Sequence, residues 1–377
     1  MQYNEFRGMG RASRLGYGLM RLPVRDGQVE EERAIRLIRR GIDAGITYLD
    51  TAYPYHGGQS EVVAGKALKD GYREKVTVTD KLPCWAVKES GDMDALLDEQ
   101  LRRLDLPYID MYLLHALNRD RYAKMKELGF RDFFRRALKD GRIRHVGFSF
   151  HDGADAFREI LDDYDGWEMC QIQYNYLDDD SQATEQGLLY AGKKNVPVVI
   201  MEPLRGGNLA RVPREIAEKM EGYPVKRSPA EWAFRFAADH EEVKVVLSGM
   251  SSEEQLEDNL RIFDGIPPRS LTEEDLRFVG EIKKAFLARQ PILCTGCRYC
   301  QPCPRGVKIP EIFEAVNRAV MFDRTEELAH RLENFRKEEA GPSRCVKCGK
   351  CESVCPQSLK IIELLKKTES GGFQVSV

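Results

Sequence analysis

The 377-residue chain lacks several features that mark particular classes of protein. It has no long basic run of the kind that binds nucleic acid, and no apolar stretch approaching the roughly 20 residues that span a membrane. Its 58 lysines and arginines nearly balance its 61 acidic residues. The start, Met1 to Glu5, shows no basic-then-apolar leader. We therefore expect a soluble, cytoplasmic protein that binds neither nucleic acid nor membrane.

Two common nucleotide-binding motifs are also missing. Gly16-Tyr17-Gly18 is followed by Arg21 at the position where the dinucleotide fingerprint G-x-G-x-x-G has its third glycine. No G-x4-G-K-[ST] sequence occurs either. A doubly wound dinucleotide-binding sheet is therefore not what the sequence favours.

Up to about residue 260, short apolar runs instead alternate with helix-like segments. In residues 31–44, for example, Ala34, Leu37, Ile38 and Ile42 recur at helical spacing. The strand-like runs are residues 15–22, 48–49, 76–78, 109–114, 146–150, 169–174, 196–201 and 243–247. Eight strand–helix units predict an α/β fold, a TIM (β/α)8 barrel.

Cysteine is concentrated at the other end, where eight of the ten cysteines lie in the last 84 residues. They form two runs, each followed by a proline: Cys294, Cys297, Cys300 and Cys303, then Cys345, Cys348, Cys351 and Cys355. The second run has the C-x2-C-x2-C-x3-C-P spacing that holds a [4Fe–4S] cluster, and the first differs by one residue in its last gap. In such runs the fourth cysteine typically ligates the other cluster. We therefore expect Cys355 to complete the cluster of the first run and Cys303 to complete that of the second.

Two other uses of these cysteines are less consistent with the spacing. Structural zinc sites usually have two C-x2-C pairs separated by a longer loop, and disulfides need an oxidising compartment. Residues 312–320 and 325–337, between the runs, look helical, so the tail is predicted to be a small, mostly helical ferredoxin-like domain. We place the barrel at residues 1–285 and the iron–sulfur domain at residues 286–377.

Titratable residues end three successive predicted strands. Asp50 ends the second strand, Lys81 the third and His115 the fourth, and Tyr55 follows Asp50 in the loop. Barrel enzymes place their chemistry at these carboxyl ends. A tyrosine titrates near 10, and we expect Lys81, held by Asp50, to lower the pKa of Tyr55. His115 would orient a carbonyl group while Tyr55 protonates its oxygen.

Loops after the last two strands are candidates for binding a pyrophosphate, because barrels often bind phosphate there beside a helix N-terminus. The candidate residues after the seventh strand are Pro203, Leu204 and Gly206. Those after the eighth strand are Gly249 and Ser251, with Gln255 and Asn259 one turn apart on the following helix. Trp85, just past Lys81, is a candidate apolar wall for a substrate pocket.

The segment Asp50-Thr51-Ala52-Tyr53-Pro54-Tyr55, with Glu61 after it, resembles the signature of the aldo/keto reductase family. Lys81 and His115 fall at the family's remaining tetrad positions, and the tail is similar to the helical ferredoxin module of several anaerobe oxidoreductases. The resemblance implies an NAD(P)H cofactor whose nicotinamide amide contacts Ser149 and Gln171, besides two [4Fe–4S] clusters. No lysine or arginine begins the last barrel helix, where many relatives grip the 2′-phosphate, so NADPH and NADH both stay open.

Three functions are consistent with these two halves. The first is nicotinamide-dependent reduction of an aldehyde or ketone to an alcohol, or the reverse, with a tail that is structural or covers the site. The second is an electron-transfer oxidoreductase in which the clusters exchange electrons with a flavin or an external ferredoxin, because nicotinamide transfers two electrons and a cluster transfers one. The third is a non-enzymatic redox sensor.

Overall fold

The computed structural model describes residues 1–6 and 10–373. The chain divides into two compact units. The first comprises Met1–Gly207 and Ala230–Leu276, and the second comprises Asn208–Pro229 and the chain from Arg277 onward. None of the helices in these described residues combines the length and apolarity that crossing a membrane requires.

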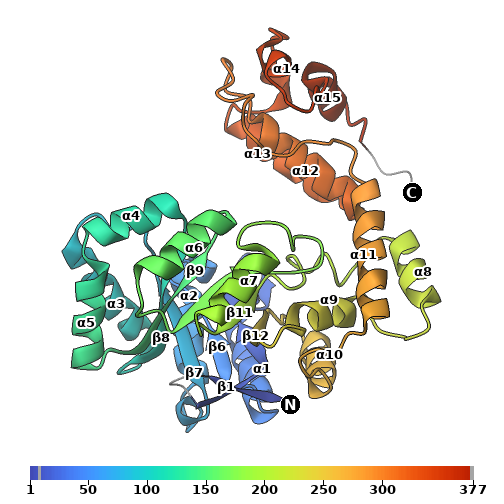
Figure 1. Cartoon of the computed structure of the whole chain (residues 1–377). Coiled ribbons are helices and arrows are strands. Elements are labelled where there is room, and N and C mark those ends of the chain that lie inside the picture. The colour runs from blue at the N-terminus through green and yellow to red at the C-terminus, as the bar shows by residue number, and fades with distance from the viewer. Residues whose placement is uncertain (7–9, 374–377) are drawn as a thin grey trace. The chain divides into compact units, whose positions relative to one another are not determined.

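Eight parallel strands form a closed barrel in the first unit (Figure 1). Around the barrel their order is β10-β11-β12-β3-β6-β7-β8-β9. The strands are β3 (Leu15–Gly18), β6 (Tyr48–Asp50), β7 (Thr77–Leu82), β8 (Ile109–Leu117), β9 (Ile143–Phe150), β10 (Met169–Gln173), β11 (Val198–Met201) and β12 (Val243–Ser248). Each coincides with one of the eight predicted runs, so the predicted TIM barrel is confirmed. The first strand is shorter than expected, because Leu19–Arg21 forms a short 3-10 helix, η1.

Helices follow the strands and bury their apolar faces against the barrel. In α1 (Glu31–Asp43) the buried face contains Ala34, Leu37, Ile38 and Ile42, the residues that recur at helical spacing. The remaining helices of this unit are α2 (Gln59–Ala67), α3 (Ser90–Leu104), α4 (Arg119–Glu127), α5 (Phe130–Asp140), α6 (Ala154–Asp163), α7 (Thr184–Lys193), α9 (Pro229–Ala238) and α10 (Glu253–Asp264).

A hairpin that the sequence did not predict covers the amino-terminal end of the barrel strands. It consists of β1 (Tyr3–Phe6) and β2 (Gly10–Ser13), which pair antiparallel. The buried side chains of Phe6 and Ala12 join the apolar cluster of the barrel interior. Asn4 Nδ2 donates to Val243 O and Lys244 O at the start of β12. With this end covered, the carboxyl ends of the strands are left to form a site.

The described regular elements of the second unit are all helices. They are α8 (Arg214–Gly222), α11 (Glu273–Ala288, which begins in the first unit), α12 (Ile309–Met321), α13 (Thr325–Lys337), α14 (Lys350–Ser353) and α15 (Ile361–Glu369), with the short η4 (Pro342–Arg344). Phe313, Phe335 and Leu365 are among its buried core residues. Asn317 holds the approach to the first cysteine run, because it accepts from Ile292 N at 3.0 Å and donates to Ile292 O at 2.7 Å. The prediction of a mostly helical tail is confirmed.

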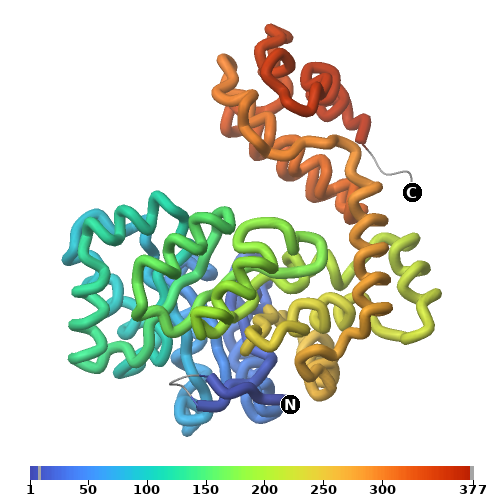
Figure 2. Tube along the Cα trace, viewed as in Figure 1, coloured from blue at the N-terminus to red at the C-terminus, as the bar shows by residue number. Residues whose placement is uncertain are grey.

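Residues 208–229 belong with this second unit, although the chain returns to the barrel after them. The trace in Figure 2 shows α8 running beside α11. Lys219 Nζ lies 3.1 Å from Glu281 Oε2, and the rings of Tyr223 and Phe278 stack with their centroids 4.1 Å apart.

The boundary expected at residue 285/286 stays a prediction. It falls within α11, whereas the two compact units meet at residue 276/277.

Candidate active site

A buried ion pair joins two of the predicted site residues at the carboxyl ends of β6 and β7. Lys81 Nζ donates to Asp50 Oδ1 at 2.7 Å and to Thr51 O at 2.7 Å. The two residues are 1% and 2% exposed. Burial is the largest single effect and lowers the pKa of Lys81, but Asp50, Tyr55 and Asp80 together outweigh it, and the net direction is upward. Lys81 is therefore a fixed ammonium ion.

Tyr55 and His115 complete the group. Tyr55 begins the short 3-10 segment η2 (Tyr55–Gly58), and the centroid of its ring lies 5.0 Å from Lys81 Nζ. The ring of His115 meets that of Tyr55 edge-on, with centroids 6.2 Å apart at 82°. The structure thus brings together the three residues predicted at strand ends, Asp50, Lys81 and His115, with Tyr55 from the loop after Asp50.

The expected lowering of the Tyr55 pKa is wrong in its net direction. Burial raises the pKa of Tyr55, and this effect is larger than the opposing effect of Lys81. His115 behaves in the complementary way: burial lowers its pKa well below the usual value, and Lys81, His151 and Arg121 lower it further. Near neutral pH the site therefore holds a protonated phenol beside a neutral imidazole.

A bulge in β8 directly follows His115. Ala116 has a φ of 54°, and the register between β8 and β9 shifts between Leu114 and Leu117. For a non-glycine residue such a backbone costs roughly 1–3 kcal/mol and persists only where its surroundings fix it. Here the amide of Ala116 donates to Ser149 Oγ at 2.7 Å. Ser149, expected to contact a nicotinamide, therefore also holds the backbone next to His115.

Gln171 joins the same network from β10, four strands away from β6 in the barrel order. Its Nε2 donates to Asp50 Oδ2 at 3.2 Å, whereas its buried Oε1 lacks a hydrogen-bond partner among the described residues. A buried amide oxygen left in this way is costly unless a ligand donates to it. The sequence had assigned Gln171 by resemblance alone, and its bond to Asp50 was missed.

Gln100, on α3, supports Lys81 from behind and was also missed. Its Nε2 donates to Lys81 O and to Glu61 Oε1, each at 3.1 Å, and its Oε1 accepts from Tyr112 at 2.6 Å. Glu61 in turn accepts from Arg103 at 2.8 Å. A glutamine at an apolar face of a predicted helix is the one sequence signal that could have indicated a buried polar partner.

The residues expected to bind a pyrophosphate lie in two loops at the ends of β11 and β12 and on α10, the helix that follows β12. Pro203, Leu204 and Gly206 follow β11, and Gly206 has a φ of 67°. After β12, Ser251 donates from its amide to Gln255 Oε1 at 2.9 Å, and buried Asn259 donates to Ser248 Oγ at 2.7 Å. Gly249 packs so closely on Arg21 that an added Cβ would lie 2.8 Å from Arg21 Cβ. Ser252 caps the N-terminus of α10, which presents backbone amides beside these residues.

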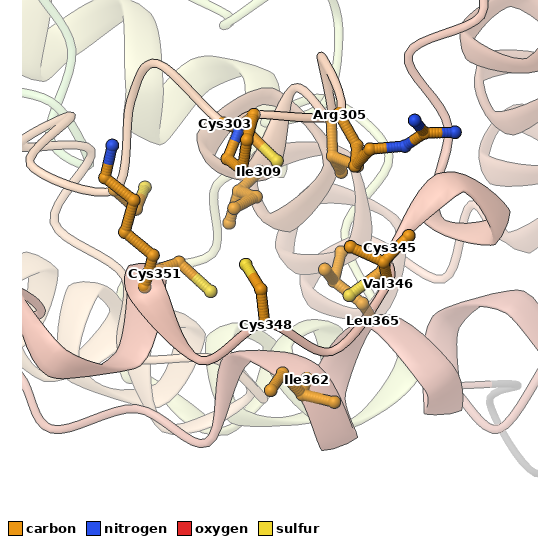
Figure 3. A pocket seen from close by; sticks show the side chains of 13 residues that line it. Cys303, Arg305, Ile309, Cys345, Val346, Cys348, Cys351, Ile362 and Leu365 are labelled. Atoms are coloured by element: carbon orange, nitrogen blue, oxygen red, sulfur yellow. The ribbon is translucent and has the colours of Figure 1, made fainter.

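The eight clustered cysteines surround two cavities in the second unit. One cavity, with about 390 Å³ of empty volume including open solvent, is lined by Cys300, Cys303, Cys345, Cys348 and Cys351 (Figure 3). The other, with about 350 Å³, is lined by Cys294, Cys297, Cys300 and Cys355. Each fourth cysteine therefore lies with the opposite run. Within residues 1–6 and 10–373, no three His, Cys, Asp or Glu side chains converge closely enough to hold a single metal ion.

The donor set of each cavity fits a [4Fe–4S] cluster, because each is lined by at least the four thiols that a cubane needs. Cys300 lines both cavities. The apolar lining includes Ile309 and Leu365 in the first cavity, and Ile309, Phe313 and Ile361 in the second. A cubane distributes its thiolates over four irons, so they need not converge on one point. Cys297 and Cys348 are exposed, and the other six are half-buried.

Comparisons with known proteins agree with both halves of the chain. The model of the aldo/keto reductase family matches residues 14–277, and that of the 4Fe-4S dicluster domain matches residues 293–360. Two methylglyoxal reductases of Escherichia coli, the second NADH-specific, are 31% and 30% identical over 180 and 226 residues. Those alignments cover 46% and 52% of this chain and 59% and 65% of the relatives, less than two thirds of either.

Longer alignments exist with other proteins. L-galactose dehydrogenase of Arabidopsis thaliana is 25% identical over 304 residues, covering 74% of this chain and 94% of that protein. The holo form of an aldo-keto reductase from Bacillus halodurans superposes with a TM-score of 0.63 and 26% identity. That superposition covers 75% of this chain and 96% of the other.

Proposed function

Because the chain belongs to the aldo/keto reductase family, whose members use NADPH or NADH, we propose that it reduces an aldehyde or ketone to the alcohol, or catalyses the reverse reaction. The observation that carries this proposal is the convergence of Tyr55 and His115 on a buried Lys81–Asp50 pair. The two relatives that reduce methylglyoxal make that ketoaldehyde a reasonable first substrate to test.

Each residue has a distinct role in the proposed reaction. When bound, the nicotinamide supplies the hydride that reaches the carbonyl carbon. Neutral His115 donates a hydrogen bond to the carbonyl oxygen and orients it. Tyr55 gives its phenolic proton to that oxygen, and Lys81 stabilises the phenolate that remains. Asp50 and Thr51 O hold the ammonium group in place.

The nucleotide is proposed to lie over the carboxyl ends of β9 to β12. Ser149 and Gln171 would contact the nicotinamide amide, with Gln171 Oε1 accepting from its NH2 group. The pyrophosphate would be bound by two loops and the helix that follows the second. The loop residues are Pro203, Leu204, Gly206, Gly249 and Ser251, and the residues of α10 are Gln255 and Asn259. Support for this placement comes from the backbone amides at the capped start of α10.

The two clusters are proposed to share ligands between the cysteine runs. Cys294, Cys297, Cys300 and Cys355 would hold one cluster, and Cys303, Cys345, Cys348 and Cys351 the other. When bound, the clusters supply one-electron redox chemistry.

The exposure of Cys297 and Cys348 favours a second candidate function, electron exchange with a flavin or an external ferredoxin. An anaerobic absorption spectrum with and without NADH or NADPH would show bound flavin and any electron flow to iron.

The phenol of Tyr55 provides the test of the reductase proposal. Tyr55→Phe should lower the turnover of methylglyoxal roughly 100- to 10,000-fold and leave the affinity for NADPH or NADH unchanged. Tyr53→Phe is the matched control, since the Tyr53 hydroxyl contacts Glu99 at 3.3 Å on the adjacent helix. Full turnover by Tyr55→Phe would reject the assignment of the proton donor.

A further inference from the structure

Building on the proposed function, we propose that Arg121, with Trp85 beside it, forms a subsite for an anionic group of the carbonyl substrate. The ligand would be a carboxylate or phosphate carried by the same molecule as the carbonyl. Arg121 is not one of the residues predicted for the tetrad or the nucleotide site. Its position follows from three contacts at the carboxyl ends of β7 and β8.

The contacts form a continuous path away from the reacting group. The ring of Tyr55 meets that of His115 with centroids 6.2 Å apart, and the ring of Trp85 lies 5.0 Å from that of His115 at 54°. The guanidinium carbon of Arg121 in turn lies 5.8 Å from the centroid of Trp85. In the proposed subsite, a carbonyl held by His115 would have Trp85 next to it and Arg121 beyond Trp85.

Arg121 is held in this position by the bulge described above. One of its terminal nitrogens donates to Ala116 O at 2.6 Å, immediately after His115 in the chain. Guanidinium carries five N–H donors in a planar fork, so this bond leaves donors for a ligand. Ala116, at positive φ, therefore binds two side chains at once. Its amide donates to Ser149 Oγ, and its carbonyl oxygen accepts from Arg121.

Arg121 has no acidic partner among the residues that the structure describes. No aspartate or glutamate within the described ranges, 1–6 and 10–373, forms an ion pair with it. Arg119, two residues earlier, is instead bound to Glu159 at 2.7 Å. The field of Arg121 reaches the site itself, where it adds to the lowering of the His115 pKa, which is due mainly to burial.

These features define a substrate class. The guanidinium fork suits the two oxygens of a carboxylate or phosphate, and the partly exposed face of Trp85, at 44% exposure, suits a short apolar spacer. The expected substrate is an aldehyde or ketone with an anionic group a few atoms from the carbonyl. Methylglyoxal lacks such a charge and would use only the reaction centre.

The experiment compares charged and neutral carbonyl compounds of matched size. The carboxylate pair is succinic semialdehyde and butanal, and the phosphate pair is glyceraldehyde 3-phosphate and glyceraldehyde. We expect wild-type protein to favour at least one anionic member in kcat/KM. Arg121→Gln should reduce kcat/KM for that compound roughly tenfold to hundredfold, mainly through KM, and leave the neutral partner within about twofold. Arg121→Lys should restore part of the loss, since it keeps the charge but not the fork.

Arg119→Gln is the control on the same helix and should change neither member of a pair. Equal losses on charged and neutral compounds would show that Arg121 only supports the fold, and the subsite would be rejected. Turnover of all four compounds without preference for charge would also reject it, while leaving the reductase proposal intact. Absence of turnover on every carbonyl tested, methylglyoxal included, would instead reject the proposed function.

Discussion

Gln171 on β10 donates a hydrogen bond to Asp50 on β6, with Nε2 and Oδ2 3.2 Å apart. The other carboxylate oxygen of Asp50 accepts from Lys81 at 2.7 Å. Strands on opposite sides of the barrel therefore hold a single buried charge pair. This network fixes the ammonium group that faces Tyr55, and it links the proposed nicotinamide contact to the proton donor.

The buried pair makes a specific prediction about stability. Lys81→Met should destabilise the barrel by roughly 3–5 kcal/mol, because it leaves the Asp50 carboxylate buried without its cation. Adding Asp50→Asn should recover part of that loss, since both charges are then gone. Urea unfolding followed by near-UV circular dichroism measures the difference between the two variants. A double variant less stable than Lys81→Met would contradict the assignment of a charge penalty.

The titration of Tyr55 and His115 makes a prediction about pH. Reduction needs a protonated Tyr55, whose pKa burial raises above the usual value of about 10. Activity should therefore be lost only as the pH rises above about 10. The pKa of His115 is well below its usual value of about 6.5, so the neutral ring persists when the pH falls through that value. We expect kcat/KM for methylglyoxal to stay level from about pH 6 to 9. A fall in kcat/KM below about pH 6.5 that is absent in His115→Asn would show that His115 titrates in this range, and would contradict the prediction.

The barrel and the tetrad could be predicted from sequence because both depend on local patterns. Strand periodicity locates the carboxyl ends of β6, β7 and β8, and chemistry gathers at those ends. Cysteine spacing likewise carries the cluster assignment. Each of these signals lies within a few consecutive residues.

The features that could not be predicted from the sequence are contacts that form only when the barrel closes, and a backbone bulge that no residue type marks. The bond between Gln171 and Asp50 joins residues 121 positions apart. Arg121 is held near His115 by a bond to the carbonyl of Ala116, a residue that adopts a positive φ. Glycine would have marked such a bulge, but alanine gives no signal. The pKa of Tyr55 was misjudged for a similar reason, since the size of its desolvation depends on neighbours from several strands.

Ligand sharing between the cysteine runs can be tested by counting iron. Wild-type protein prepared without oxygen should hold about eight irons, and Cys355→Ser should hold about four. Adding Cys297→Ser, which lines the same cavity as Cys355, should cause no further loss. Adding Cys348→Ser instead should remove nearly all iron, because that cysteine lines the other cavity. The reverse pattern would mean that each run holds its own cluster, and Cys170→Ala serves as a control outside the runs.

The first turn of α10 leads to a prediction about the nucleotide. It carries Glu253 and Glu254, and Glu253 is tied to Arg33 at 2.6 Å. A 2′-phosphate bound beside this turn would add about two negative charges and be repelled by these carboxylates. Glu254→Lys should therefore tighten NADPH binding roughly fivefold and leave NADH binding nearly unchanged.

Fluorescence titration with each nucleotide at low and high salt measures this effect, which salt should weaken. Glu257→Lys is the matched control, because Glu257 faces Arg40 at 2.9 Å one turn further along the helix. If Glu257→Lys tightened NADPH binding equally, the effect would come from the net charge of α10 and not from the position of Glu254. A gain confined to Glu254→Lys, lost at high salt, would locate the ribose of the nucleotide at the first turn of α10, next to Ser251 and Gln255.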